Sequence, residues 1–260
     1  ELDEVPPQFE VEAGAAESPD AAADLVRSRI GFDAATRRGW QSEYAALRAW
    51  RRAIEDLGAL VFQISGVDVE ETRGFSCYYH PLPVIAVNSA DAPVARVFTL
   101  AHELGHLMRR SGATCDLRDG GDEEVWCNRF AGELLVPRDE LTTLVPRARA
   151  EWTDSELQRI ARAFWVSSEV ALRRLVAIER ATPEFYEQWR ARRIVRKPTT
   201  AGGPVPIPKR LLSSAGTTFV RLVLSAFHAD RISASTMASY LGVKLKHLSA
   251  IEQLVVAEAS

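Results

Sequence analysis

The chain has 260 residues, of which 47% are hydrophobic and 26% charged, and its formal net charge is −3. This composition allows a sizeable core in one large or two small domains, and the slightly acidic balance argues against a surface coated by nucleic acid. No apolar run approaches the roughly 18–20 residues of a membrane span, and the three cysteines form no C-x-x-C pair. We therefore expect a cytoplasmic protein without a disulfide framework or a membrane partner. Because it does not begin with methionine, the chain is also expected to be a fragment of a longer protein.

The N-terminal part predicts a tail followed by two helices. Residues 1–18 are acidic, contain prolines and lack apolar periodicity, so they are expected to be a tail or linker. A helix should begin after Ser18, which can cap it, and should end before Gly31. A second helix is predicted over about 42–57, where apolar residues recur at helical spacing on one face.

Three β-rich runs come next, at residues 59–64, 75–79 and 82–88. A small sheet in this position, packed on helices, predicts the α+β class and an outer strand that could pair with an extended substrate. The second run ends with Tyr78 and Tyr79, and His80 follows. These three side chains are candidates for polarising a scissile carbonyl or stabilising its oxyanion, although strand aromatics and a surface imidazole remain the alternative.

The strongest chemical signal is an H-E-x-x-H motif formed by residues 102–106. On a helix, this spacing places His102 and His106 on one face, where both imidazoles can reach one zinc ion at roughly 2.0–2.1 Å. Glu103 then faces the open metal position, where a carboxylate can take a proton from water and so act as general base. Gly105 lets a neighbouring backbone or a substrate approach closely.

The residues around the motif predict a core-facing helix. Apolar residues recur at three- and four-residue steps through the stretch 94–108. This stripe favours a buried catalytic helix over the alternative of a helix with two satisfied histidines and a solvated glutamate.

A third zinc ligand is expected from the following helix. Glu124 is the preferred candidate, because Asn128 lies one turn later on the same face and could hold the outer nitrogen of a ligand histidine. Glu123 and Glu133 are the competing candidates. Glu123 points about 100° away from Glu124 by helix geometry, and Glu133 suits a solvated or salt-bridged position. Cys115, in the loop between the two helices, could in principle approach the metal.

The stretch from Val84 to Pro137 resembles the ImmA/IrrE family of metallopeptidases. The resemblance rests on the strand 84–88, the H-E-x-x-H helix and the pattern Glu124-x-x-x-Asn128-Arg129-Phe130-Ala131-x-Glu133-Leu134-Leu135-x-Pro137. It implies that Glu124 completes a Zn²⁺ site with His102 and His106. Known members are bacterial cytoplasmic proteases that cleave a helix-turn-helix repressor of the XRE type. The resemblance thus implies such a protein substrate, and derepression of stress or mobile-element genes. The motif-bearing match covers about residues 60–180.

The C-terminal part predicts further helical segments after a zinc peptidase-like domain over residues 19–150. Residues 151–197 have the spacing of a helix-turn-helix, with Ser167 capping its second helix, and could serve in packing, substrate docking or DNA contact. Residues 198–210 are rich in Pro and Gly and are expected to be a linker. Residues 211–260 predict a helical module with a second helix-turn-helix-like pattern, suited to DNA binding, dimerisation or repressor recognition.

These features together predict a zinc-dependent endopeptidase that cleaves a cytoplasmic transcriptional repressor. One alternative is a DNA-binding transcriptional regulator whose peptidase-like domain is a sensor or docking module. DNA could then be contacted by the helix-turn-helix-like segments or by an upstream domain. Another alternative is a toxin–antitoxin partner that binds a protein without cutting it. The intact Glu103 favours the enzyme.

Overall fold

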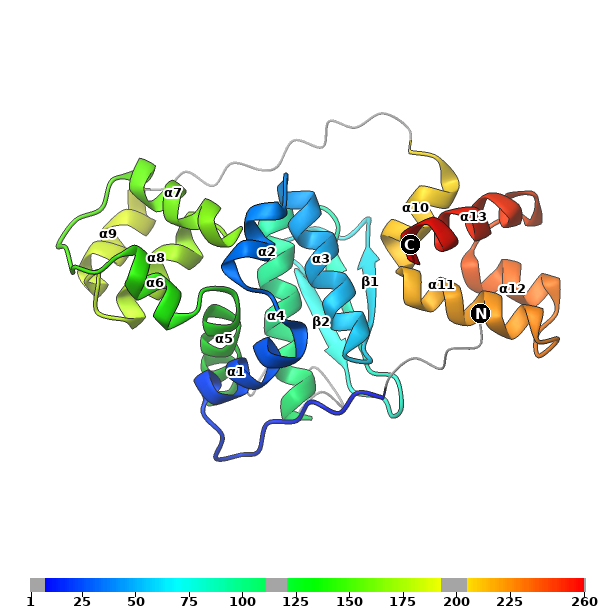
Figure 1. The fold of residues 1–260 in the computed structure, drawn as a ribbon, viewed down its shortest axis with the longest axis horizontal. Coiled ribbons are helices and arrows are strands. Elements are labelled where there is room, and N and C mark those ends of the chain that lie inside the picture. The colour runs from blue at the N-terminus through cyan, green and yellow to red at the C-terminus, as the bar shows by residue number, and fades with distance from the viewer. Residues whose placement is uncertain (1–7, 111–120, 193–204, 260) are drawn as a thin grey trace.

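A computed structural model describes residues 8–110, 121–192 and 205–259, and it confirms the α+β class (Figure 1). The elements up to the end of the sheet are α1 (Pro19–Ile30), α2 (Ala34–Gly39), α3 (Glu43–Asp56), β1 (Leu60–Ile64), β2 (Gly74–Cys77) and β3 (Val84–Asn88). The next helices are α4 (Pro93–Arg109), α5 (Asp122–Leu135), α6 (Arg138–Leu144), α7 (Asp154–Phe164), α8 (Ser168–Ala177) and α9 (Pro183–Arg192). The C-terminal part holds α10 (Ile207–Ala215), α11 (Thr217–His228), α12 (Ala234–Leu241), a short 3₁₀ helix η1 (Leu245–His247) and α13 (Leu248–Ala259).

Local capping sets the ends of the first helices. The hydroxyl of Ser18 accepts a hydrogen bond from the backbone N–H of Ala21 at 3.1 Å, and Gly31 ends α1 in the left-handed region at φ 71°. The helix α3 also begins and ends within one residue of its predicted bounds. In contrast, α2 was not predicted, because its six residues are too few to show an apolar period.

The sheet has the order β1–β3–β2, with β3 in the centre. β1 runs parallel to β3, whereas β2 runs antiparallel to it, so that Val61 and Ser76 both lie beside Ile85. The central residues of β3 are buried on both faces, as expected for a strand covered by helices. Within the described part of the chain, β1 and β2 are therefore the two edges.

Two hydrophobic clusters form the interior of the described residues. The larger cluster extends from Val11 to Trp189 and includes the inner faces of α1, α3, α4, α5, α7 and α8. The predicted helix-turn-helix-like pair, α7 and α8, is present, and Ser167 caps α8 by accepting from the N–H of Val170 at 3.2 Å. This pair shares its core with the peptidase-like part. The smaller cluster, from Leu211 to Val255, belongs to α10–α13.

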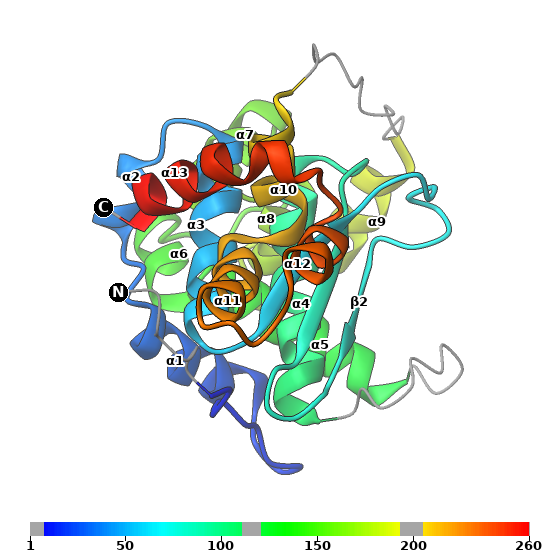
Figure 2. The same ribbon diagram turned by 90° about the vertical axis from the view of Figure 1, so that its right-hand side faces the viewer.

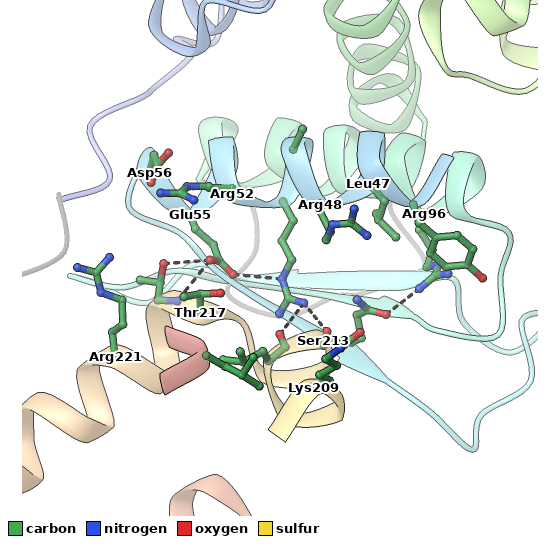
Figure 3. A pocket seen from close by; sticks show the side chains of 17 residues that line it. Leu47, Arg48, Arg52, Glu55, Asp56, Arg96, Lys209, Ser213, Thr217 and Arg221 are labelled. Atoms are coloured by element: carbon green, nitrogen blue, oxygen red, sulfur yellow. Dashed lines mark hydrogen bonds and ion pairs between the residues drawn. The ribbon is translucent and has the colours of Figure 1, made fainter. Parts of the chain in front are cut away.

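The C-terminal helices contact the β1 edge of the sheet. α10 lies beside β1 (Figures 1 and 2). The rings of Phe62 in β1 and Phe219 in α11 meet with centroids 5.2 Å apart. Glu55 of α3 accepts a hydrogen bond from the hydroxyl of Thr218 at 2.9 Å, and Glu55 lies close to α11 in Figure 3. Arg51 donates to the backbone carbonyls of Leu212 and Ser213 in α10. The β1 edge is thereby covered.

The structure corrects two expectations about connecting segments. Val11 and Ala13 are buried, and the N–H of Ala13 donates to the carbonyl of Met108 at 2.9 Å, so residues 8–18 are not a free tail. Their alternating burial is that of an extended segment, which the acidic and proline-rich composition concealed. The expected linker 198–210 includes the start of α10, which begins at Ile207 with Pro208 in its first turn. Residues 198–204 lie outside the described part. No described helix is both long and apolar enough to span a membrane.

Candidate metal centre

The two motif histidines lie on the face of α4 that meets α5. His102 and His106 are one turn apart, and their Nε2 atoms are separated by 3.2 Å. Both side chains are mostly buried, with 14% and 19% of their surface exposed. At most one of these two nitrogens can donate a proton to the other, whereas a shared cation would engage the lone pairs of both.

Glu124 of α5 completes a triangle with these nitrogens. Its carboxylate oxygens lie 3.2 Å from Nε2 of His102 and 3.1 Å from Nε2 of His106. Ligands of a tetrahedral zinc ion at 2.0–2.1 Å lie about 3.3–3.4 Å from one another, so the three separations fit one ion closely. The set of two imidazoles and one carboxylate is also the chemistry of catalytic zinc sites. The residues present therefore fit zinc.

The direction of the pKa shift of His102 agrees with a role as a metal ligand. Burial lowers the pKa of His102, and the neighbouring Glu124 carboxylate opposes this effect only in part. A neutral imidazole is the form that binds metal, so burial reduces competition by protons.

Glu123 supports the site in a way that its spacing did not reveal. Its Oε1 lies 3.0 Å from Nδ1 of His106, while Nε2 of the same ring faces Glu124. Because the two nitrogens lie on opposite sides of an imidazole, His106 can contact two glutamates that point about 100° apart on a helix. A carboxylate on the outer nitrogen fixes the orientation and tautomer of a ligand histidine.

Asn128, predicted to hold an outer nitrogen, lies beside His102. Its side chain raises the pKa of His102 as a hydrogen-bonding neighbour, although burial outweighs this effect. The buried Nδ1 of His102 has no hydrogen-bond partner of good geometry among the described residues.

Glu103 lies on α4 between the two histidines in sequence, and a strand of the sheet holds its carboxylate. It is buried, and one carboxylate oxygen accepts a hydrogen bond from the hydroxyl of Ser76 in β2 at 2.8 Å. Burial raises the pKa of Glu103, while the Ser76 hydroxyl and the charge of His106 lower it. Ser76 was missed in the sequence analysis, because a serine in a strand carries no motif. The one signal that could have found it is its position in the β-rich run before the H-E-x-x-H helix.

The close approach of α4 and α5 depends on Gly105. A Cβ atom at this position would lie 3.1 Å from Phe130 and 3.2 Å from the Sγ of Cys127. The neighbour that Gly105 was expected to admit is thus α5. Cys127 also forms a second possible metal group with His106 and Glu123, but burial raises the pKa of its thiol strongly. The group of His102, His106 and Glu124 matches the two-histidine, one-carboxylate ligand set of catalytic zinc sites and is therefore preferred.

The predicted carbonyl-polarising residues lie beyond the end of β2. Tyr78 is half-buried beneath the guanidinium of Arg110, whereas Tyr79 is 71% exposed and His80 is exposed. In the described residues, no hydrogen bond joins these three side chains to the motif histidines, and their catalytic role stays a prediction. Cys115 lies outside the described residues.

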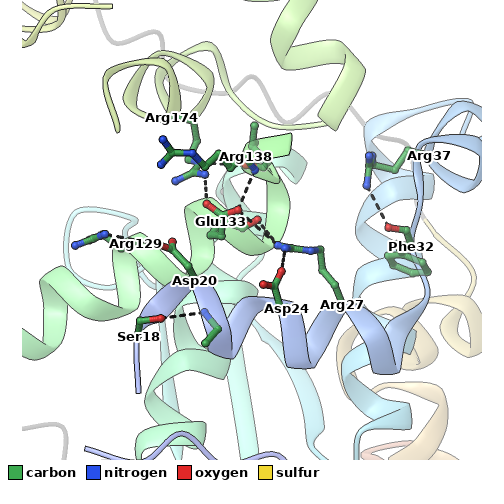
Figure 4. A network of polar contacts seen from close by, with 12 residues as sticks. Ser18, Asp20, Asp24, Arg27, Phe32, Arg37, Arg129, Glu133, Arg138 and Arg174 are labelled. Carbon is green, nitrogen blue, oxygen red and sulfur yellow. Dashed lines mark hydrogen bonds and ion pairs between the residues drawn. The ribbon is translucent and has the colours of Figure 1, made fainter. Parts of the chain in front are cut away.

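Glu133, the other competing ligand, serves a different purpose. It is 5% exposed and forms an ion pair with Arg174 of α8, accepts the N–H of Arg138 at 2.9 Å, and lies 3.9 Å from Arg27 of α1 (Figure 4). It is therefore salt-bridged, as one of the two expectations had it, and not solvated. The network ties α5 to α1 and α8.

A peptidase family model, described as the IrrE N-terminal-like domain, matches residues 54–176. Residues 54–176 are an IrrE N-terminal-like domain. This confirms for that segment the resemblance inferred from the sequence. The domain contains every side chain of the candidate metal centre.

A solved structure of a Mycobacterium tuberculosis transcriptional regulator is similar at 19% identity, with a TM-score of 0.42. The similarity covers 61% of this chain and 46% of the regulator, so the chain spans less than half the length of that protein. No curated protein matches.

Proposed function

We propose that the IrrE N-terminal-like domain is a zinc-dependent endopeptidase. The observation that carries this proposal is the convergence of His102, His106 and Glu124 within 3.2 Å of one another, with Glu103 on the same helix. Two imidazoles and one carboxylate leave a tetrahedral ion one open position, which is the arrangement of catalytic sites and not of structural ones. When bound, zinc would act as a Lewis acid on the substrate carbonyl and on water.

Three side chains of the domain would have further roles in the reaction. Glu103 accepts a proton from the attacking water and returns it to the leaving amine, as a general base and then a general acid. Ser76 holds the carboxylate of Glu103 from the sheet, so that one oxygen is fixed and the other is free to move a proton. Glu123 holds the His106 ring in place.

We propose that the substrate binds as an extended strand along β2. Ser76 of β2 contacts the general base, and β2 has no further strand on its outer side in the described part of the chain. An exposed edge strand offers a row of N–H and C=O groups to an extended peptide. From the family resemblance, we propose that this peptide belongs to a cytoplasmic helix-turn-helix repressor of the XRE type.

The main rival, direct DNA reading by the helix-turn-helix-like pair, has less support. Arg174 of α8 is buried and paired with Glu133, and Arg173 pairs with Glu169 at 3.3 Å. Arg180 donates to the carbonyl of Val145 at 3.1 Å. A DNA-reading helix keeps its basic residues free for phosphates and bases, whereas these three are engaged within the chain.

The decisive experiment replaces Glu103 without disturbing the metal ligands. The purified chain and its Glu103→Gln variant are incubated with candidate XRE-type repressors, and zinc content is measured by elemental analysis. We expect Glu103→Gln to retain zinc and to lose cleavage by roughly two to four orders of magnitude, the usual contribution of a general base. Glu187→Gln, an exposed glutamate of α9, is the matched control and should cleave normally.

Two results would contradict the proposal. Cleavage that persists in Glu103→Gln would remove the general base from the mechanism. A chain that binds no zinc, and that binds DNA tightly without cutting any repressor, would favour the regulator.

A further inference from the structure

A cavity lies where the C-terminal helices meet α3, away from the candidate metal centre (Figure 3). It has a volume of about 580 Å³, within the range of roughly 300–1,000 Å³ that small-molecule sites occupy. One wall comes from α3, β1 and α4, and the other from α10, α11 and α13. None of the three candidate zinc ligands lines it.

The lining of this cavity is strongly basic. Two acidic residues, Glu55 and Asp56, are present among the lining residues. The cationic residues number six and come from both walls: Arg48, Arg51, Arg52, Arg96, Lys209 and Arg221. A positive cavity in a chain of net charge −3 is a local concentration of charge that attracts anions.

Interactions within the protein account for only part of this charge. Arg51 pairs with Glu55 at 3.2 Å. Burial raises the pKa of Asp56, and the charges of Arg52 and Arg221 oppose this effect only in part. Arg48 and Lys209 form no ion pair with any residue that the structure describes. They come from opposite walls, α3 and α10, as Figure 3 shows.

Arg96 marks the buried side of the cavity. It is 6% exposed, and its guanidinium donates to the side-chain oxygen of Gln63 at 2.7 Å and lies over the ring of Tyr44. Its Nε atom is buried and has no partner among the described residues. A buried donor without an acceptor is costly, so this part of the cavity wall has an unmet demand for an acceptor. Apolar side chains, Leu47, Leu212 and Leu254, complete the lining.

We propose that this cavity binds a small phosphorylated ligand. Phosphate groups match the planar fork of arginine and form charge-assisted hydrogen bonds with it. The ligand would bridge Arg48 on α3 and Lys209 on α10, and so link the two hydrophobic clusters of the chain. The apolar patch provides space for the non-phosphate part of the ligand. This site does not depend on the proposed peptidase activity.

Calorimetric titration of the full chain with inorganic pyrophosphate and with ADP tests the proposal. We expect saturable binding of one molecule per chain, and preference for ADP would distinguish a nucleotide from a free phosphate compound. Arg48→Glu and Lys209→Glu should each weaken binding about tenfold or more, because each removes an attractive charge and adds a repulsive one. Arg159→Glu, on an exposed position of α7, makes the same charge change elsewhere and should bind normally.

Controls separate this site from the metal centre and from misfolding. Both probes bind zinc in solution, so the titrations are repeated on chelator-treated protein, where the affinity should be unchanged. Urea unfolding of each variant verifies that the fold is retained. The proposal is overturned if neither probe binds with a Kd below about 1 mM, or if Arg159→Glu weakens binding as much as the cavity variants. Binding of a short DNA duplex but of neither small anion would also overturn it.

Discussion

At the scale of single residues, His106 is the most constrained side chain of the candidate site. One ring nitrogen faces Glu124 and His102, and the other meets Glu123 at 3.0 Å. A carboxylate on the outer nitrogen of a ligand histidine holds the ring in one orientation. Glu123 should therefore affect zinc affinity although it is not expected to touch the ion.

Replacing Glu123 tests whether this residue positions His106 without binding the zinc ion itself. Glu123→Ala should lower zinc affinity by roughly 10–100-fold, and Glu123→Gln less, because an amide oxygen still accepts from the ring N–H. Competition against a chromogenic zinc chelator measures both. Glu187→Ala is the matched control, and an affinity of Glu123→Ala equal to that of this control would show that Glu123 does not position His106.

The sequence identified the residues that belong to a recognisable motif or pattern. His102, His106 and Glu103 follow from helix periodicity alone, and the structure brings Glu124 to the two histidines. Ser76 and the contact of Glu123 with His106 escaped prediction, because they depend on how β2 and α5 approach α4. The distances from β2 and α5 to α4 are set by tertiary packing, which cannot be read from the order of the elements along the chain.

At the scale of elements, the spacing of α4 and α5 controls whether the donors can converge. Gly105 faces Phe130 and Cys127, both fully buried, so a larger side chain there has no free space to enter. Close packing transmits such a volume change to the backbone, which would move Glu124 away from the histidines.

Gly105→Val tests this dependence. Overpacking should destabilise the fold by about 1–3 kcal/mol and should also weaken zinc binding, since it separates the two ligand helices. Gly39→Val, at the end of α2 where nothing lies within 4 Å of a Cβ atom, is the control and should retain zinc affinity. Urea unfolding and chelator competition give the two readouts. Normal zinc affinity in a destabilised Gly105→Val would show that the helix spacing does not set the site.

The long periodic helices and the three strands were predictable, whereas two short helices, α2 and α10, were not. α1, α3 and α4 have clear caps or apolar stripes, and their bounds match the prediction closely. α2 is too short to show a period, and α10 was concealed by the proline-rich stretch before it. Proline is compatible with the first turn of a helix, so composition alone misplaced the end of the linker.

At the scale of the whole molecule, one guanidinium joins the two hydrophobic clusters. Arg51 is 8% exposed, pairs with Glu55 of its own helix, and donates to the carbonyl of Val61 in β1 as well as to those at the end of α10. Gly216 follows α10 at φ 85°, and a Cβ atom there would collide with the carboxylate of Glu55. The junction is therefore polar, and it leaves no room for a side chain at position 216.

Arg51→Met should loosen this junction. The change leaves the carboxylate of Glu55 buried without its cation, which typically costs about 3–5 kcal/mol. Hydrogen exchange measured by mass spectrometry should become faster in α10 and β1 but not at the α4–α5 contact. Arg38→Met, at an exposed position of α2, is the control. Unchanged exchange in α10 would show that Arg51 does not hold the C-terminal helices.

The coverage of one edge of the sheet also limits how the proposed peptidase could be inhibited. Because α10 and α11 cover β1, the β2 side is the one edge among the described strands that can accept an added strand. A useful compound would thus be a short, strand-mimicking peptide that carries a hydroxamate near its centre. The peptide flanks would pair with β2 and extend the sheet, while the hydroxamate would bind the zinc ion. Shortening either flank should therefore weaken inhibition even when the hydroxamate is kept.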